Sequence, residues 1–267
     1  MSGESKISPR SVEFDFDRVP VHWVGDRPFL THLLNALHFL FEHGERWFCD
    51  AFRETLPQIQ DTRLLGEARG FIAQEATHSH HHARFLARLD SQGLNLPGVS
   101  ELIKREIARW QRWASLHSQV AMIAGIEQYT AMLGAWIFAQ DTLRDAGPVM
   151  RDLFLWHSAE EIEHKSVAFD LLQALRPGYF YRVAHFAVAS TSLFVGWGLI
   201  LMLLIWRDKH ASLRAVLVDF ARALRDGDFP LRPVLRGAVR YLKPGFHPRE
   251  DDNLHLSTNY FASRAGS

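Results

Sequence analysis

Two copies of a Glu-x-x-His motif carry residue types that bind metal ions. The first copy is Glu75-Ala76-Thr77-His78 and the second is Glu161-Ile162-Glu163-His164. On a helix, residues three apart share a face, so each copy can present a carboxylate and an imidazole to one metal ion. One copy alone is weak evidence because helices are rich in Glu, but two copies in similar surroundings are harder to obtain by chance.

Each motif can be matched with a glutamate on the helical pattern before it. Glu45 lies about 30 residues before Glu75, and the turn-like stretch 56–62 lies midway between them. Glu127 lies about 34 residues before Glu161, again with a turn-like stretch near the midpoint. Residues equidistant from the turn of an antiparallel helical hairpin sit at the same height, so the members of each pair would meet. The spacing predicts two similar hairpins, a degenerate internal repeat.

Together the hairpins supply four glutamates and two histidines. The predicted metal ligands are Glu45, Glu75, His78, Glu127, Glu161 and His164. This is the ligand set of ferritin-like di-iron or di-manganese bundles. Four carboxylates balance two divalent ions, and the oxygen-rich set suits iron first, with manganese and zinc as alternatives. We expect an all-α, ferritin-like four-helix bundle that holds two metal ions.

Glu42 competes with Glu45 as the ligand on the first helix. His38, Glu42 and Glu45 fall on one stripe of that helix. Glu45 is preferred because its reflection across the turn meets Glu75, whereas Glu42 lies a turn further away. The choice between the two glutamates stays open at the level of the sequence.

Two residues near the second motif are predicted to take part in catalysis. His157 lies on the ligand face of the fourth helix, and Glu160 reaches His164 at a spacing of four. In a hydrolytic reaction His157 or Glu160 would carry protons. A ligating histidine usually gives its other N–H to a carboxylate, a role open to Glu160, Glu163 or Asp170.

Composition limits the class of protein. The chain has 267 residues, 47% of them apolar, and a formal net charge of zero without a long run of one sign, so no nucleic-acid partner is expected. The single cysteine, Cys49, excludes an intrachain disulfide and fits a reducing compartment. The polar N-terminus lacks the apolar core of a signal peptide, which predicts a bundle in the cytoplasm.

Four parts are expected along the chain. They are an irregular N-terminal arm over 1–27, the two-metal bundle over 28–178, a hydrophobic helix over 179–209, and basic amphipathic helices with a tail over 210–267. Within the bundle, the helical pattern of 100–144 should break near 115–118, because a 45-residue helix would be unusual in a compact domain. The fourth helix is expected from about Pro148 to Leu175.

The hydrophobic helix predicts association with a membrane. Residues 183–206 contain no Asp, Glu, Lys or Arg, and about 24 residues can cross the hydrocarbon layer. A buried core helix and an in-plane anchor are the alternatives. Basic segments follow it, which favours the cytoplasmic face of the inner membrane. If both flanks are cytoplasmic, a single full crossing is excluded and the segment is re-entrant or monotopic.

Several stretches together resemble a known family. They are Asn35-Ala36-Leu37, Gly44-Glu45-Arg46-Trp47-Phe48, 71–78, Glu127 with Tyr129-Thr130-Ala131, 156–170 and 241–248. Over residues 10–250 this pattern resembles the bacterial predicted metal-dependent hydrolases, which are placed with the ferritin-like proteins. The resemblance implies hydrolysis. The first helix departs from the pattern, since His38 and Glu42-His43 stand where small or apolar residues are expected.

The residues support three functions. The first is O₂-dependent hydroxylation or desaturation of an apolar or lipid-like substrate at a di-iron centre, which needs an electron donor. The alternative is hydrolysis by a water that two metals activate. The third is metal binding without catalysis. Besides the substrate, membrane lipid is the expected binding partner, and a homodimer is compatible with the sequence. Serine-hydrolase and nucleotide chemistry are poorly supported, because Gly-x-Ser-x-Gly and Gly-rich phosphate motifs do not occur.

Overall fold

The structure is a computed structural model that describes residues 7–265, and over this range it contains helices and no strand. The prediction of an all-α fold is confirmed. The α-helices are α1 (Pro28–Thr55), α2 (Thr62–Ser91), α3 (Pro97–Trp113), α4 (Leu116–Gln140), α5 (Pro148–His164), α6 (Val167–Ala174), α7 (Tyr179–Arg207), α8 (Leu213–Asp226), α9 (Leu231–Tyr241) and α10 (Leu254–Ala265).

The helix ends follow local chemistry. Pro28, Pro97 and Pro148 open α1, α3 and α5, where the missing N–H of proline costs nothing. The Asp61 carboxylate accepts hydrogen bonds from two backbone N–H groups at the start of α2. The Ser115 hydroxyl caps α4 in the same way, so the break expected near 115–118 lies between α3 and α4.

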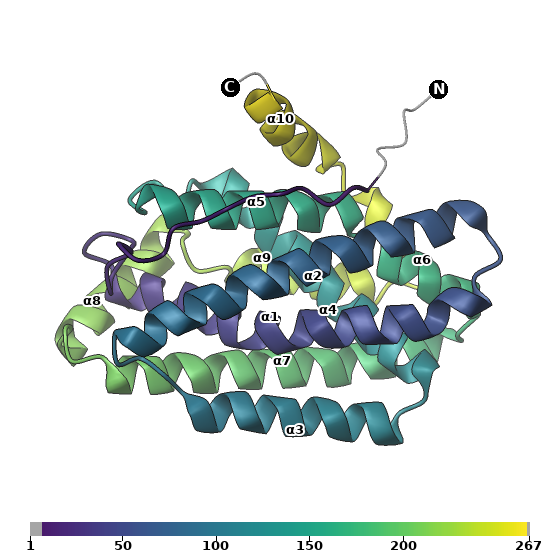
Figure 1. Ribbon diagram of the computed structural model, residues 1–267, viewed down its shortest axis with the longest axis horizontal. Coiled ribbons are helices and arrows are strands. Elements are labelled where there is room, and N and C mark those ends of the chain that lie inside the picture. The colour runs from purple at the N-terminus through teal and green to yellow at the C-terminus, as the bar shows by residue number, and fades with distance from the viewer. Residues whose placement is uncertain (1–6, 266–267) are drawn as a thin grey trace.

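Helices α1, α2, α4 and α5 form a four-helix bundle. Helices α1 and α2 make one hairpin and α4 and α5 the other, and α1 packs on α4 while α2 packs on α5 (Figure 1). The expected fourth helix is interrupted, because α5 ends at His164 and α6 begins at Val167. The backbone keeps right-handed helical angles at Lys165 and Ser166, and the Lys165 side chain donates hydrogen bonds to the Asp251 carbonyl and the Asn253 side chain at this break.

The N-terminal arm runs along the bundle as an extended segment without regular structure over 7–27 (Figure 1). Its apolar side chains Phe14 and Phe16 are buried, and Phe14 packs against Trp156 of α5. Arg88 of α2 donates a hydrogen bond to the Val19 carbonyl at 3.0 Å. The arm therefore covers the seam between α2 and α5.

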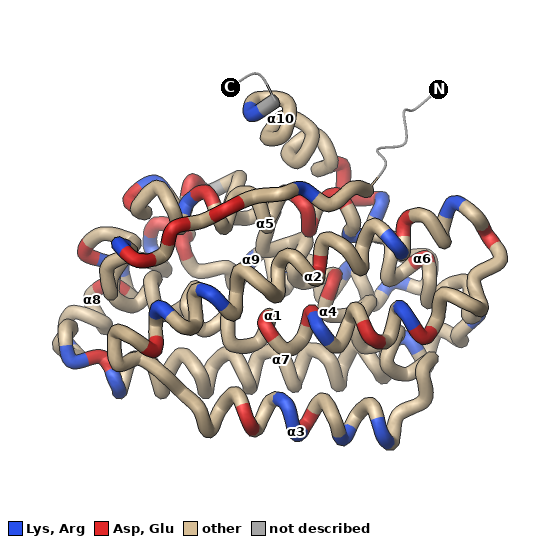
Figure 2. The backbone as a smooth tube through the Cα atoms, viewed as in Figure 1, with Lys and Arg blue, Asp and Glu red and all other residues tan. Residues whose placement is uncertain are grey.

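Helix α7 lies outside the bundle along α1 and α4. Its inner stripe is buried, and the Trp197 indole N–H donates to the Leu33 carbonyl at 2.8 Å. Two helices are apolar and long enough to cross a membrane, but 83% of the apolar stretch of α4 is buried, against only 22% for α7. Helix α4 is therefore a core helix, whereas α7 combines an apolar inner stripe with an apolar surface. Figure 2 shows no charged residue along the central length of α7.

The remaining helices are attached to the outside of the bundle. Helix α8 packs on α1, α9 on α4 and α10 on α5. The guanidinium of Arg27, which is 1% exposed, bridges the carboxylates of Asp219 in α8 and Asp228 in the turn after it. A buried cation between two carboxylates fixes α8 against the start of α1, since removing either partner would leave an uncompensated charge.

Candidate metal centre

The six predicted ligands converge in the interior of the four-helix bundle. Helix α1 supplies Glu45, α2 supplies Glu75 and His78, α4 supplies Glu127, and α5 supplies Glu161 and His164. All six are buried, with at most 4% of any residue exposed. Buried carboxylates need a compensating cation or hydrogen-bond donors, so this convergence calls for an electrostatic explanation.

One group of ligand atoms comes from the two Glu-x-x-His motifs. Glu75, His78, Glu161 and His164 each offer an atom, and these atoms lie within 4.8 Å of one another. His164 Nε2 is 3.1 Å from Glu75 Oε1, and its Nδ1 is 3.1 Å from Glu127 Oε2. Glu127 therefore joins this group through His164. The two motifs face each other across the bundle, as the hairpin repeat predicts.

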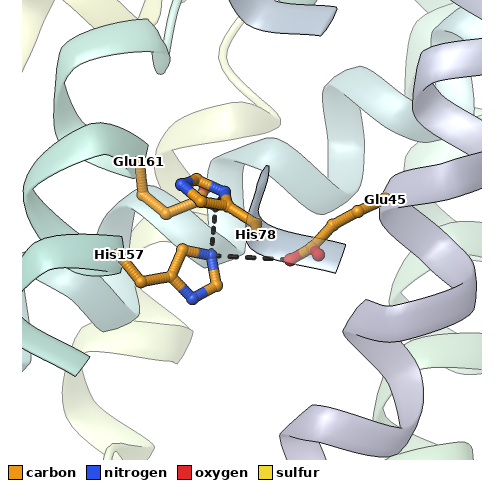
Figure 3. A group of neighbouring side chains, drawn as sticks. All are labelled: Glu45, His78, His157 and Glu161. Carbon is orange, nitrogen blue, oxygen red and sulfur yellow. Dashed lines mark hydrogen bonds and ion pairs between the residues drawn. The ribbon is translucent and has the colours of Figure 1, made fainter. Parts of the chain in front are cut away.

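A second group lies beside the first (Figure 3). It consists of Glu45, His78, His157 and Glu161, whose ligand atoms also lie within 4.8 Å of one another. His157 Nε2 is 2.8 Å from Glu161 Oε1 and 3.5 Å from Glu45 Oε1. His157, expected as a proton carrier, thus lies where it could also be a ligand. The two groups adjoin because both contain His78 and Glu161. A carboxylate can bridge two ions, so Glu161 could serve both groups, whereas the one ring nitrogen of His78 that faces the cluster could bind only one ion.

The polar atoms of the cluster fit cations. Seven buried atoms of the six ligands have no hydrogen-bond partner within the described part of the chain: Glu45 Oε2, both oxygens of Glu75, His78 Nδ1, Glu127 Oε1, Glu161 Oε2 and His164 Nε2. An unpaired buried polar atom costs free energy, and native proteins contain few. Oxygen and imidazole nitrogen are donors suited to divalent metals, so two bound ions would satisfy these atoms together.

The pKa values of two glutamates in the cluster also favour a bound cation. Burial, and then the negative charge of Glu161, raises the pKa of Glu127 to about 8. Burial and the neighbouring Glu75 carboxylate also raise the pKa of Glu45 well above its usual value. In contrast, the pKa values of Glu75 and Glu161 are lowered, and against the effect of burial the carboxylates beside them raise the pKa values of His78 and His164. Two divalent ions would supply the positive charge that keeps Glu45 and Glu127 ionised as well.

Behind the ligands, a polar layer orients His78. Glu160 Oε2 lies 3.0 Å from His78 Nε2, which leaves Nδ1 facing the cluster. Arg10 of the arm bonds to Glu160 at 2.9 Å and to Glu163 at 2.8 Å, and Gln74 donates to Glu163 at 2.8 Å. Glu160, predicted to be catalytic, thus contacts His78 and Arg10 and is in neither group of converging ligand atoms.

The structure separates Glu45 from its competitor on the first helix. The Glu42 carboxylate binds His43 at 3.0 Å and Arg46 at 3.1 Å, both on its own helix. Neither group of converging ligand atoms includes Glu42. Glu45 faces the cluster, whereas the Glu42 side chain, which is 12% exposed, is occupied by its ion pairs with His43 and Arg46.

Two histidines that were not among the predicted ligands, His38 and His82, lie beside Glu45. His82 Nε2 is 3.2 Å from Glu45 Oε1, and His38 Nδ1 is 2.7 Å from His82 Nδ1. Burial, and then the charge of His157, lowers the pKa of His38 to about 3, so the imidazole is neutral at pH 7. The position of His38 on the same helical stripe as Glu45 indicates from the sequence that it lies near the site. The sequence contains no such indication for Arg10, because the arm has no helical periodicity.

Comparison with known proteins agrees with this site. The family model described as "Predicted metal-dependent hydrolase" matches residues 8–252, which covers all six ligands and the arm. The chain belongs to this family. No curated protein and no solved structure matches the chain. Membership supports a metal-dependent enzyme and agrees with hydrolysis, the alternative drawn from the sequence. It does not support the oxidation that the residues alone had placed first.

Proposed function

We propose that this protein is a hydrolase that uses two metal ions. The observation that carries the proposal is the pair of adjoining ligand groups that share His78 and Glu161. In two-metal enzymes, such a pair of ions binds a water between them and lowers its pKa, which makes a nucleophile at neutral pH. The family description supports the same reaction class.

Different residues of the chain would bind the ions, orient a ligand and accept a proton. The six ligands hold the ions, and Glu160, held by Arg10, keeps His78 in its orientation. Burial, and then the charge of His78, lowers the pKa of His157 below its usual value, so this imidazole is neutral at pH 7 and can accept a proton. The surrounding helices keep bulk water out, which strengthens each electrostatic interaction at the site.

A second function rests on the donor set itself. Four glutamates and two histidines on four helices are the ligand set of di-iron carboxylate bundles. With iron bound, the site would support O₂-dependent hydroxylation or desaturation, and the enzyme would then need an electron donor. Metal content and oxygen dependence separate the two functions.

Purified full-length protein is expected to contain about two metal ions per chain and to hydrolyse acyl-ester or amide substrates equally well without oxygen, since each proposed ligand group holds one ion. Elemental analysis and an assay in ¹⁸O-labelled water under anaerobic conditions test this. One labelled oxygen should enter each acid product. Activity that requires O₂, together with two irons per chain, would instead establish the oxidative function.

We also propose that the enzyme works at the cytoplasmic face of the inner membrane on an apolar or lipid-like substrate. The outer stripe of α7 supports this, with Val195 55%, Met202 60% and Trp206 78% exposed. A surface helix of a soluble protein normally turns polar residues outward, and contiguous exposed apolar surface marks an interaction site. Because the inner stripe of α7 packs on the bundle, the helix would lie in the membrane plane as a monotopic anchor.

Two lysines on the outer stripe should release the protein from membranes. Val195→Lys with Met202→Lys changes exposed residues only, so the bundle keeps its packing while burial in lipid becomes unfavourable. Gly66→Lys with Ala76→Lys adds the same charge to exposed positions of α2 and should leave the protein on the membrane. The measurement is the fraction of protein that sediments with membranes. Equal distribution of the two double variants would contradict in-plane attachment through α7.

A further inference from the structure

Helix α3 does not fill the space beneath it. It packs beside α1 and α4, yet none of its residues is buried. Its sequence is amphipathic, with Leu102, Ile103, Ile107 and Trp110 on the face turned to the bundle and Lys104 and Arg105 on the other. Ile103, Ile107 and Trp110 are partly buried against the bundle, whereas Leu102 is 48% exposed. Apolar faces of helices are normally buried, so this incompletely covered face has room for a further apolar partner.

An apolar groove of about 470 Å³ runs between α3 and the bundle. Besides the face of α3, side chains of α1, α4 and α7 line it, among them Trp47, Met122 and Leu193. This volume falls within the roughly 300–1,000 Å³ of small-molecule sites. Glu106 is the only charged residue in the lining, and it pairs with Arg109 at 2.5 Å. The groove thus suits a hydrocarbon and offers little to a polar ligand.

The groove is continuous with the outer stripe of α7. Val195 and Leu199, which are 55% and 50% exposed, belong both to the stripe and to the lining of the groove. Helices α3 and α7 run side by side along one edge of the molecule (Figure 1). Helix α3 carries a net excess of cations, because Glu101 and Glu106 pair with Lys104 and Arg109 while Arg105 and Arg112 add further positive charge, and Arg207 and Lys209 lie at and after the end of α7. Such an arrangement fits lipid chains between the helices and anionic headgroups beside them.

The groove also adjoins the metal centre. Gly44 and Ile126 line the groove, and the residues that follow them, Glu45 and Glu127, belong to the ligand set. Successive residues on a helix point about 100° apart, so α1 and α4 present adjoining faces to the groove and to the metals. Only these two helices separate an occupant of the groove from the cluster.

We propose that the groove between α3 and α7 binds one acyl chain of a membrane lipid. Continuity with the exposed stripe of α7 and the flanking cations identify the bilayer as the source of the chain. This inference rests on the proposed attachment to the membrane, and it names the chemical class that the site next to the metals receives. A second copy of the protein would leave the cationic edge without a partner.

Filling the groove tests the proposal. A Cβ at Gly44 meets no atom within 4 Å, and Gly44 lines the groove, so Gly44→Leu directs a side chain from an open position into the groove. Gly66→Leu is the matched control, because Gly66 is also a helical glycine with open space, but it lies on the exposed face of α2. Full-length proteins are extracted in mild detergent and washed exhaustively, and the phospholipid retained per chain is measured by extraction and mass spectrometry.

Wild type and Gly66→Leu should retain about one phospholipid per chain, and Gly44→Leu should retain at least tenfold less. Equal retention by the two variants, or none in the wild type, would overturn the proposal. Light scattering measures the oligomeric state of the same samples. Conversion of a dimer to a monomer by Gly44→Leu alone would show that a second copy fills the groove. Metal content, measured on the same samples, keeps the two proposals apart, because it tests the two-metal site and should not change with Gly44→Leu.

Discussion

Replacing Glu161 with Ala is expected to remove at least one metal ion and to abolish turnover. Glu161 offers oxygens to both ligand groups, so its loss affects both ion positions. Only 4% of the residue is exposed, and water cannot easily take the place of the lost carboxylate. The measurement is the metal content of the purified variant, with far-UV circular dichroism to show that the helices persist.

Glu163→Ala is the matched comparison on the same helix. Glu163 lies about 100° from His164 on α5 and bonds to Arg10 and Gln74 instead of facing the cluster. Its loss removes a contact behind the ligands, for which a roughly 10- to 100-fold drop in metal affinity is typical. A Glu161→Ala protein that keeps both metals, while Glu163→Ala loses them, would overturn the assignment of the ligand face.

Removing the metals should lower the melting temperature strongly. An ion present at about 1,000 times its dissociation constant stabilises the folded state by about 4 kcal/mol. For a chain of this size each kcal/mol corresponds to roughly 2–4 °C, so even one ion accounts for a shift of roughly 8–16 °C. Metal-free protein also has to bury carboxylates whose charges repel one another. Calorimetry before and after chelation, followed by re-addition of metal, measures the effect.

The control for this prediction is the variant that binds less metal. Chelator should lower the melting temperature of Glu161→Ala less than that of the wild type, because the variant has already lost at least one of its bound ions. If chelation leaves the melting temperature of the wild type unchanged while removing the ions, the cluster does not depend on metal for its stability, and the proposed charge balance is wrong.

Helical periodicity and residue spacing were sufficient to predict much of the fold of this protein. The all-α class followed from apolar repeats, and the break before α4 followed from the length of the pattern. The interruption after His164 was not predicted, and the contacts of Lys165 at this point join it to Asp251 and Asn253, which lie far away in the sequence. Local propensity describes a segment by itself, whereas such a contact exists only once the chain has folded.

The sequence by itself was enough to predict that these six side chains come together and in which pairs, because the distance of a residue from a turn sets its height in a helical hairpin. Only the tertiary structure decided between Glu42 and Glu45, since one turn of helix separates them and both suit a metal. It also decided that Glu160 supports His78 while His157 lies among the ligand atoms, and that Arg10 reaches the site. These contacts join elements remote in sequence, and their direction depends on how the helices pack.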